Sequence, residues 1–187
     1  MPTPGSTPNR RDLRRLAMQV LYQLDVTQPK AKPDDDSPAP LPSAADLAES
    51  LDEEHDELTT RKFAAELALQ AWDQRNDADL RVAALAPDWP THRQPPVDRA
   101  ILRLAYYEMA SGHAPVKVAI NEAVELAKDY GSEQSPPVSN GVLDKLAKTI
   151  NAPTPESDAE GLAAAAQPPA DEPPSDTDQW LDDALEK

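Results

Sequence analysis

The fold follows from residues 97–148, which read VDRAILRLAYYEMASGHAPVKVAINEAVELAKDYGSEQSPPVSNGVLDKLAK. Apolar side chains recur there three or four positions apart, which is the spacing of one face of an α-helix. Ser111, Gly112 and Gly131 interrupt the pattern, and glycine commonly stands just after the last residue of a helix. The segment therefore predicts three amphipathic helices, over about 97–111, 115–130 and 135–150.

Further helices are predicted on the N-terminal side of this segment. The first begins near Asn9, whose side chain suits an N-cap, and ends before Pro29. A short acidic helix is expected over about 44–54, and a longer one over about 58–75. Four side chains form the expected inner face of the longer helix: Phe63, Leu67, Ala71 and Trp72. A short helix follows, and no segment shows the period of two that a strand requires, so the predicted class is all-α with about six to seven helices.

Proline and charge divide the chain of 187 residues into a folded part and flanking segments. The chain has 21 prolines, and many of them cluster at 2–8, 29–42 and 153–174, outside the predicted helices. We expect a disordered leader at 1–8, a helical domain at 9–150 with a Pro/Asp-rich insertion at about 29–43, and an acidic disordered tail at 151–187.

The net charge of −16 is unevenly distributed along the sequence. Residues 29–58 carry a net charge of −8 and residues 151–187 one of −9, whereas the remainder carries +1. The acidity therefore lies in proline-rich segments, and the basic residues of the predicted domain remain free to form a local patch.

Composition excludes several classes of protein. The chain contains no cysteine, so disulfides and thiolate chemistry are excluded. The three histidines show no metal-ligand spacing, and no glycine-rich phosphate loop is present. No apolar run approaches the roughly 18 residues of a membrane span, and the first residues lack the apolar core of a secretory signal. We therefore expect a cytoplasmic protein with no cofactor, no metal and no catalytic residues.

Basic residues crowd the start of the first predicted helix. Arg10, Arg11, Arg14 and Arg15 stand where the helix dipole disfavours cations. They form either a solvated polar face or a set of phosphate contacts, for which the planar guanidinium is well suited.

Four segments carry a resemblance to a known family: RRDLRRLAMQVLYQL near the N-terminus, and DRAILRLAYYE, VKVAINEAVELAKDYG and NGVLDKLAK within 97–148. Together they resemble the NusB family of RNA-binding transcription antitermination factors. The resemblance implies a helical bundle in two subbundles. It also implies binding of boxA-type single-stranded RNA together with a small-subunit ribosomal protein, called NusE in transcription complexes. The pair would join the elongating RNA polymerase.

The resemblance implies roles for particular residues. Arg10, Arg11 and Arg14 match basic positions of the family's N-terminal motif, whereas Asp12 and Arg15 depart from it and Arg15 can compensate for Asp12. These residues, with Lys117 and Asn121 of a later helix, would form the RNA surface. Tyr22 and Asp98 would lie at the contact with the ribosomal protein.

Some polar residues have structural readings. Arg103 is expected to pair with Glu108 or Glu122, and Glu125 with Lys128. Ser135 is expected to cap the last helix, and Gly141 to allow a close helix approach.

Two other functions remain open at the level of sequence. The chain could be a protein–protein scaffold that has lost RNA binding and works through its acidic segments. It could also be the helical RNA-binding module of a ribosomal RNA methyltransferase system, which would require a cofactor-binding α/β domain and a catalytic cysteine.

Overall fold

A computed structural model describes residues 9–28, 40–51 and 57–150 of the chain. The predicted leader, the greater part of the predicted insertion and the predicted tail lie outside the described residues.

The described residues form seven α-helices and one short 3-10 helix, with no strand among them. The helices are α1 (Arg10–Thr27), α2 (Ala44–Glu49), α3 (Leu58–Asp73), α4 (Arg75–Leu85), α5 (Pro96–Ala110), α6 (Val116–Tyr130) and α7 (Ser135–Thr149). The 3-10 helix η1 (Thr91–Arg93) precedes α5. The predicted all-α class is confirmed, and the three helices predicted over 97–150 lie within a residue or two of their expected bounds.

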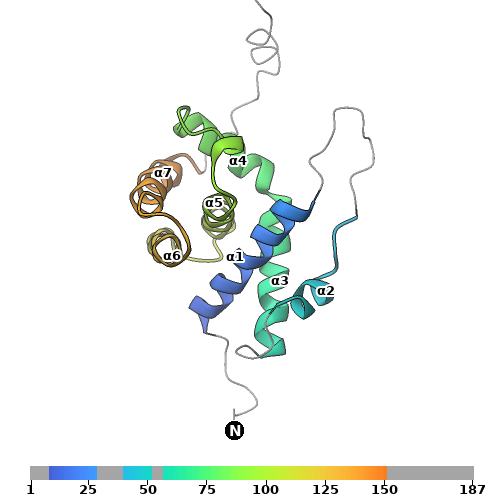
Figure 1. Ribbon diagram of the computed structural model, residues 1–187. Helices are drawn as coiled ribbons and strands as arrows, with labels where there is room; N and C mark the ends of the chain where they lie inside the picture. Colours follow the sequence, from blue (N-terminus) through green and yellow to red (C-terminus); the bar gives the residue numbers. More distant parts are fainter. Residues whose placement is uncertain (1–8, 29–39, 52–56, 151–187) are drawn as a thin grey trace, which may run out of the picture. The chain divides into compact units, whose positions relative to one another are not determined.

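Helix α5 is the centre of the packing. It contacts α1 and α3 on one side and α4, α6 and α7 on the other, as Figure 1 shows with α5 seen nearly end-on. Every residue from 100 to 109 in α5 is buried. A helix that is buried all round is typical of the interior of a bundle, and α5 therefore joins the α1–α3 group to the α4, α6 and α7 group.

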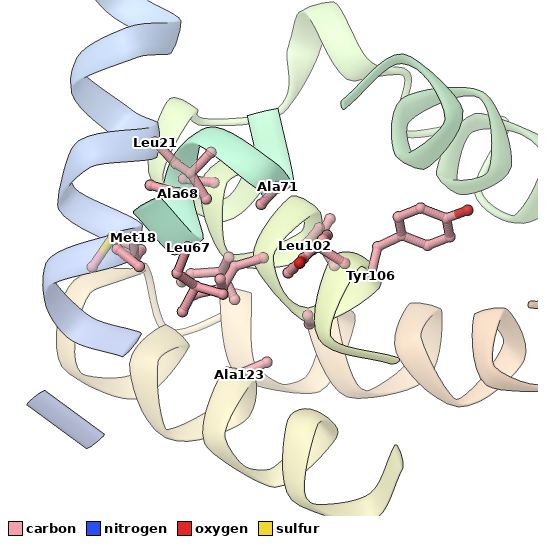
Figure 2. Close-up of a cluster of buried hydrophobic side chains, with 14 of the residues drawn as sticks. Met18, Leu21, Leu67, Ala68, Ala71, Leu102, Tyr106 and Ala123 are labelled. Atoms are coloured by element: carbon pink, nitrogen blue, oxygen red, sulfur yellow. The ribbon is translucent and has the colours of Figure 1, made fainter. Parts of the chain in front are cut away.

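The core between α1, α3 and α5 is built from close-packed aliphatic side chains. Figure 2 shows Met18 and Leu21 of α1 directed toward Leu67 and Ala68 of α3, with Leu102 of α5 beside them. All five are at most 4% exposed. Ala64, Ala65 and Ala68 of α3 are fully buried, and such small side chains allow neighbouring helices to approach α3 closely.

Helix α1 begins as the sequence predicts. The Asn9 side chain accepts a hydrogen bond of 3.1 Å from the backbone N–H of Arg11, which satisfies one of the free donors of the first turn. The cap therefore fixes where the helix starts.

The prediction for α3 is wrong at one position. Leu67, Ala71 and Trp72 are buried as expected, but Phe63 is 51% exposed. The buried face of α3 instead runs through smaller and polar residues, among them Thr60, Ala64 and Ala68. Phe63 therefore lies on the solvent side of the helix.

The start of α7 differs from its prediction. Gln134 occupies the N-cap position, and the Ser135 hydroxyl lies inside the fold. That hydroxyl accepts a hydrogen bond of 2.9 Å from the Ser132 backbone N–H and donates one of 3.1 Å to Oδ2 of Asp98. Ser135 therefore joins α7 to α5 instead of capping α7.

Gly131 stands just after the last residue of α6, as the sequence predicts, whereas the prediction for Gly141 is wrong. A Cβ atom on Gly131 would lie 2.5 Å from Cβ of Ser135, so Gly131 is the position that permits close approach. A Cβ atom on Gly141 would meet nothing within 4 Å, so the predicted close approach at Gly141 is wrong.

Arg103 forms part of a buried ion-pair network between helices. Its guanidinium lies 2.7 Å from Oδ1 of Asp25 in α1 and 2.6 Å from Oδ2 of Asp79 in α4. Asp25 also accepts from Arg99. The expected pairing of Arg103 with Glu108 or Glu122 is wrong, because Arg103 points from α5 toward α4 and the last turns of α1.

Candidate nucleic-acid interface

The arginines of α1 point in different directions. Arg10 and Arg11 are exposed in the first turn. Arg15 is partly buried, and its Nε lies 4.0 Å from Oδ1 of Asp12, one turn back along the helix. Asp12, which departs from the family pattern, therefore partly neutralises the charge of Arg15.

Arg14 turns into the protein. It is 5% exposed, and its Nε lies 2.9 Å and 3.0 Å from the two carboxylate oxygens of Glu108, which is itself buried in α5. The pair compensates two charges that would be costly to bury alone. The predicted phosphate contact of Arg14 would require this guanidinium to leave Glu108, so Arg14 is not available at the surface in this structure.

Arg11 joins α1 to α6. Its Nε lies 3.3 Å from Oε2 of Glu122, and its second guanidinium nitrogen lies 3.4 Å from Oε1. This hydrogen bonding raises the pKa of Arg11, with a smaller attraction from Glu125 and Asp129 on the same helix. The contact places the start of α1 beside the first half of α6.

Lys117 and Asn121 lie on that half of α6. Both are exposed, and their spacing of four residues places them on one face of the helix. Asn121 directly precedes Glu122, which holds Arg11. The Arg11–Glu122 contact thus brings the start of α1 beside the part of α6 that carries Lys117 and Asn121, whereas Arg14 is buried against Glu108. Further along α6, the predicted pair of Lys128 with Glu125 is confirmed at 2.6 Å.

The two residues predicted for the ribosomal partner have different environments. Tyr22 is 43% exposed on α1, three turns beyond Arg11, and so presents its ring to solvent. Asp98 is 2% exposed in the first turn of α5, and burial raises the pKa of its carboxyl, partly offset by the Ser135 hydrogen bond. Oδ1 of Asp98 has no hydrogen-bond partner within the described part of the chain. Asp98 therefore lies inside the fold, where its carboxylate accepts a hydrogen bond from Ser135 of α7.

A pocket next to Arg10 was missed by sequence reasoning. It has a volume of about 280 Å³. Its lining comes from α1, α3 and the turn between α5 and α6: Arg10, Leu13, Phe63, Glu66, Leu67, Gln70 and His113. The spacing of the four α3 residues at i, i+3, i+4 and i+7 marks one helical face, but periodicity alone assigned that face to the core.

The structure adds two negative findings, both limited to residues 9–28, 40–51 and 57–150. No group of three or more His, Cys, Asp or Glu side chains is arranged to hold a metal ion there. None of the helices in those ranges is both long and apolar enough to cross a bilayer.

Comparison with known proteins identifies the family. Residues 11–148 match the model of the NusB family. The chain is 39% identical over 158 residues to the transcription antitermination protein NusB of Herpetosiphon aurantiacus, covering 82% of this chain and 97% of that protein. It is 40% identical to the protein of the same name from an Anaeromyxobacter species, over 74% of this chain and 89% of the relative.

The fold agrees with the sequence match. A solved structure of T. maritima NusB superposes with a TM-score of 0.60 at 30% identity, covering 76% of this chain and 93% of that one. These matches confirm the predicted family, the all-α fold and the expectation that the chain is not an enzyme. The chain therefore belongs to the NusB family.

Proposed function

We propose that this chain is a transcription antitermination factor that binds boxA-type single-stranded RNA of ribosomal RNA operons. It does so together with a small-subunit ribosomal protein acting as NusE, and the complex joins elongating RNA polymerase in the cytoplasm. The relatives described above are named transcription antitermination proteins, which supports this role.

The observation that carries the RNA-binding proposal is the contact between Arg11 and Glu122. It links the arginine-bearing turn of α1 to the part of α6 that holds Lys117 and Asn121. Arg10, Arg11, Arg15 and Lys117 would supply contacts to phosphates, and Asn121 would supply a hydrogen bond to sugar or base. Such a surface suits a single strand, whose backbone can follow a short cationic path.

The local charge predicts that affinity without a partner is modest. Glu122 neutralises part of Arg11, and Glu125 and Asp129 lie close enough to act on the same guanidinium. Phosphates that approach this surface therefore meet carboxylates as well as cations. A partner protein that completes the site supplies the missing attraction, and the exposed ring of Tyr22 is our proposed anchor for that partner.

The proposal is tested by the double variant Arg10→Ala/Arg11→Ala in a titration with boxA-type RNA at several salt concentrations. Each phosphate contact that is lost should reduce the slope of log affinity against log salt by about 0.7 for a single strand. Arg93→Ala is the matched control, because Arg93 is exposed in η1 at the other end of the bundle. Arg99 shows that η1 lies near the last turns of α1, because it donates hydrogen bonds both to the Thr91 carbonyl in η1 and to Asp25 in α1. Asp25 is 14 residues from Arg11, or about 20 Å along the helix.

A protein–protein scaffold that does not bind RNA is the second candidate. The burial of Arg14 and the pairing of Arg11 with Glu122 favour it, because both withdraw positive charge from the surface. This candidate predicts tight binding of the ribosomal protein with no RNA affinity in either the presence or the absence of that partner.

A further inference from the structure

Phe63 is the only phenylalanine of the chain, and half of its surface is open to solvent. The opposite face of α3 is closed against α1, α2 and α5, so the ring is not required to fill the core. Exposure of a large apolar ring costs solvation free energy and indicates a binding surface when the ring lines a cavity.

The Phe63 pocket, defined as the cavity of about 280 Å³ next to Arg10, is lined by both apolar and polar side chains. Leu13, Leu67 and Phe63 are its apolar lining residues, and Glu66 and Gln70 stand one and two turns beyond Phe63 on the exposed face of α3. The volume lies just below the roughly 300–1,000 Å³ of sites for drug-sized ligands, so it suits one flat ring system.

The polar side of the pocket is held in place by α5. The hydroxyl of the buried Tyr107 donates a hydrogen bond to Oε1 of Gln70. This bond fixes the orientation of the Gln70 amide and leaves its NH2 group to interact with a ligand. The ring of His113, which also lines the pocket, lies 6.3 Å from the Tyr107 ring, centroid to centroid. The Glu66 carboxylate can only accept hydrogen bonds when ionised, so it suits a ligand edge that carries N–H donors.

Arg10 belongs to both the Phe63 pocket and the cationic surface proposed to hold phosphates. A strand whose phosphate binds Arg10 would place the attached base within reach of the cavity. An aromatic face beside a cation on a backbone track is the arrangement by which proteins bind unpaired nucleotides.

We propose that the Phe63 pocket receives one unpaired nucleobase of the bound RNA. The base stacks on Phe63, and an exocyclic amino group on its edge donates to the Glu66 carboxylate, which favours adenine, cytosine or guanine over uracil. This inference rests on the proposed RNA-binding function and assigns it a base-reading site outside the α1–α6 surface.

The test uses the full chain with its ribosomal partner and boxA-type RNAs that carry 2-aminopurine at one position at a time. One position should lose fluorescence on binding, because stacking on an aromatic ring quenches this base. Phe63→Ala should abolish that change and weaken RNA binding by about 5-fold or more, while Phe63→Trp should restore both. Leu80→Ala is the control, since Leu80 is an exposed apolar residue of α4 that does not line the pocket.

Glu66→Gln gives a second, independent readout. It should change the preference among bases at the quenched position more than it changes the overall affinity, because only the proposed acceptor for the base edge is altered. A thermal melt of each variant checks that the fold is kept, which the exposure of Phe63 and Glu66 leads us to expect.

The possible failures are distinguishable. If the wild-type complex binds RNA with a salt slope that depends on Arg10 and Arg11, but Phe63→Ala changes neither affinity nor fluorescence, the pocket proposal is overturned and the proposed function stands. If Phe63→Ala weakens binding of the ribosomal protein and leaves the RNA affinity of the chain alone unchanged, the pocket is a protein-docking site. Absence of RNA binding by the wild-type complex would overturn both.

Discussion

Nε of Arg11 in α1 lies 3.3 Å from Oε2 of Glu122 in α6, and this exposed ion pair is where two candidate RNA-binding helices meet. The contact brings basic residues together that are more than a hundred positions apart in the sequence. The contact also limits how strongly Arg11 can attract a phosphate, because Glu122 competes with the phosphate for the same guanidinium. Under the proposed function, tight RNA binding would therefore need a partner that shifts this competition.

Glu122→Gln should tighten RNA binding by a few-fold at low salt and by less at high salt. The neutral amide releases Arg11 and removes a charge that repels phosphates, whereas an exposed ion pair adds little to folding. Titration of the variant without the ribosomal protein measures the effect. Asp88→Asn, which makes the same charge change on an exposed loop before η1, should leave the affinity unaltered. Weaker RNA binding by Glu122→Gln would mean that the pair orients Arg11 for RNA instead of competing with it.

Arg14→Ala should reduce the free energy of unfolding by about 3–5 kcal/mol, because it leaves the Glu108 carboxylate buried without its cation. The double variant Arg14→Met/Glu108→Leu should recover most of that loss, since it removes both charges and retains the volume. Urea unfolding of the two variants gives the comparison.

The same double variant decides whether Arg14 contacts RNA. With its fold restored, it should bind RNA within about 2-fold of the wild-type chain, because Arg14 is turned inward. A large loss of RNA affinity in a stable double variant would restore Arg14 to the set of phosphate contacts.

Local sequence patterns predicted the helices but not the direction of individual side chains. Asn9 as the cap of α1 could be read from residue type and position, because capping depends on near neighbours. The inward turn of Arg14 could not, since it depends on Glu108, 94 positions away. The exposure of Phe63 likewise depends on which face of α3 meets α1. Because α3 has alanines on several faces, its sequence alone does not show which face is buried. The partners of Arg103 were missed for the same reason.

Asp98→Asn should stabilise the fold at neutral pH. Burial raises the pKa of the Asp98 carboxyl, so its ionised form is disfavoured in the folded state. The stabilisation that this group contributes is present below the unfolded pKa of about 3.9 and is lost as pH rises through the higher folded pKa. The difference in unfolding free energy between wild type and variant should therefore be small near pH 3.5. It should grow above pH 4 and level off, reaching on the order of 1 kcal/mol.

Urea titrations of both proteins between pH 3.5 and 7 test this prediction. The difference between the two proteins cancels the other titrating groups. An Asp98→Asn variant that is less stable than wild type at pH 7 would contradict it and would indicate that the charged carboxylate is required. The same variant also tests the predicted role of Asp98 in partner binding, because its fold is expected to be intact.

Gly131→Ala and Gly141→Ala form a matched pair. The added methyl group at Gly131 would lie 2.5 Å from Cβ of Ser135 and 2.7 Å from the Ala127 carbonyl oxygen, so the turn between α6 and α7 must shift. We expect Gly131→Ala to reduce the free energy of unfolding by about 1–3 kcal/mol. At Gly141, inside α7 with open space around it, alanine should be neutral or stabilise by up to about 1 kcal/mol. Equal melting temperatures of the two variants would contradict the close approach at Gly131.

The central claim, that this chain binds RNA through the α1–α6 surface and needs its partner to do so tightly, is tested most directly by one titration. The wild-type chain is titrated with boxA-type RNA, with and without the small-subunit ribosomal protein, at two salt concentrations. We predict weak, salt-dependent binding by the chain alone and binding at least about 10-fold tighter with the partner, with the salt slope retained. Absence of RNA binding in both states, or affinity that does not change with salt, would contradict the account and favour the scaffold.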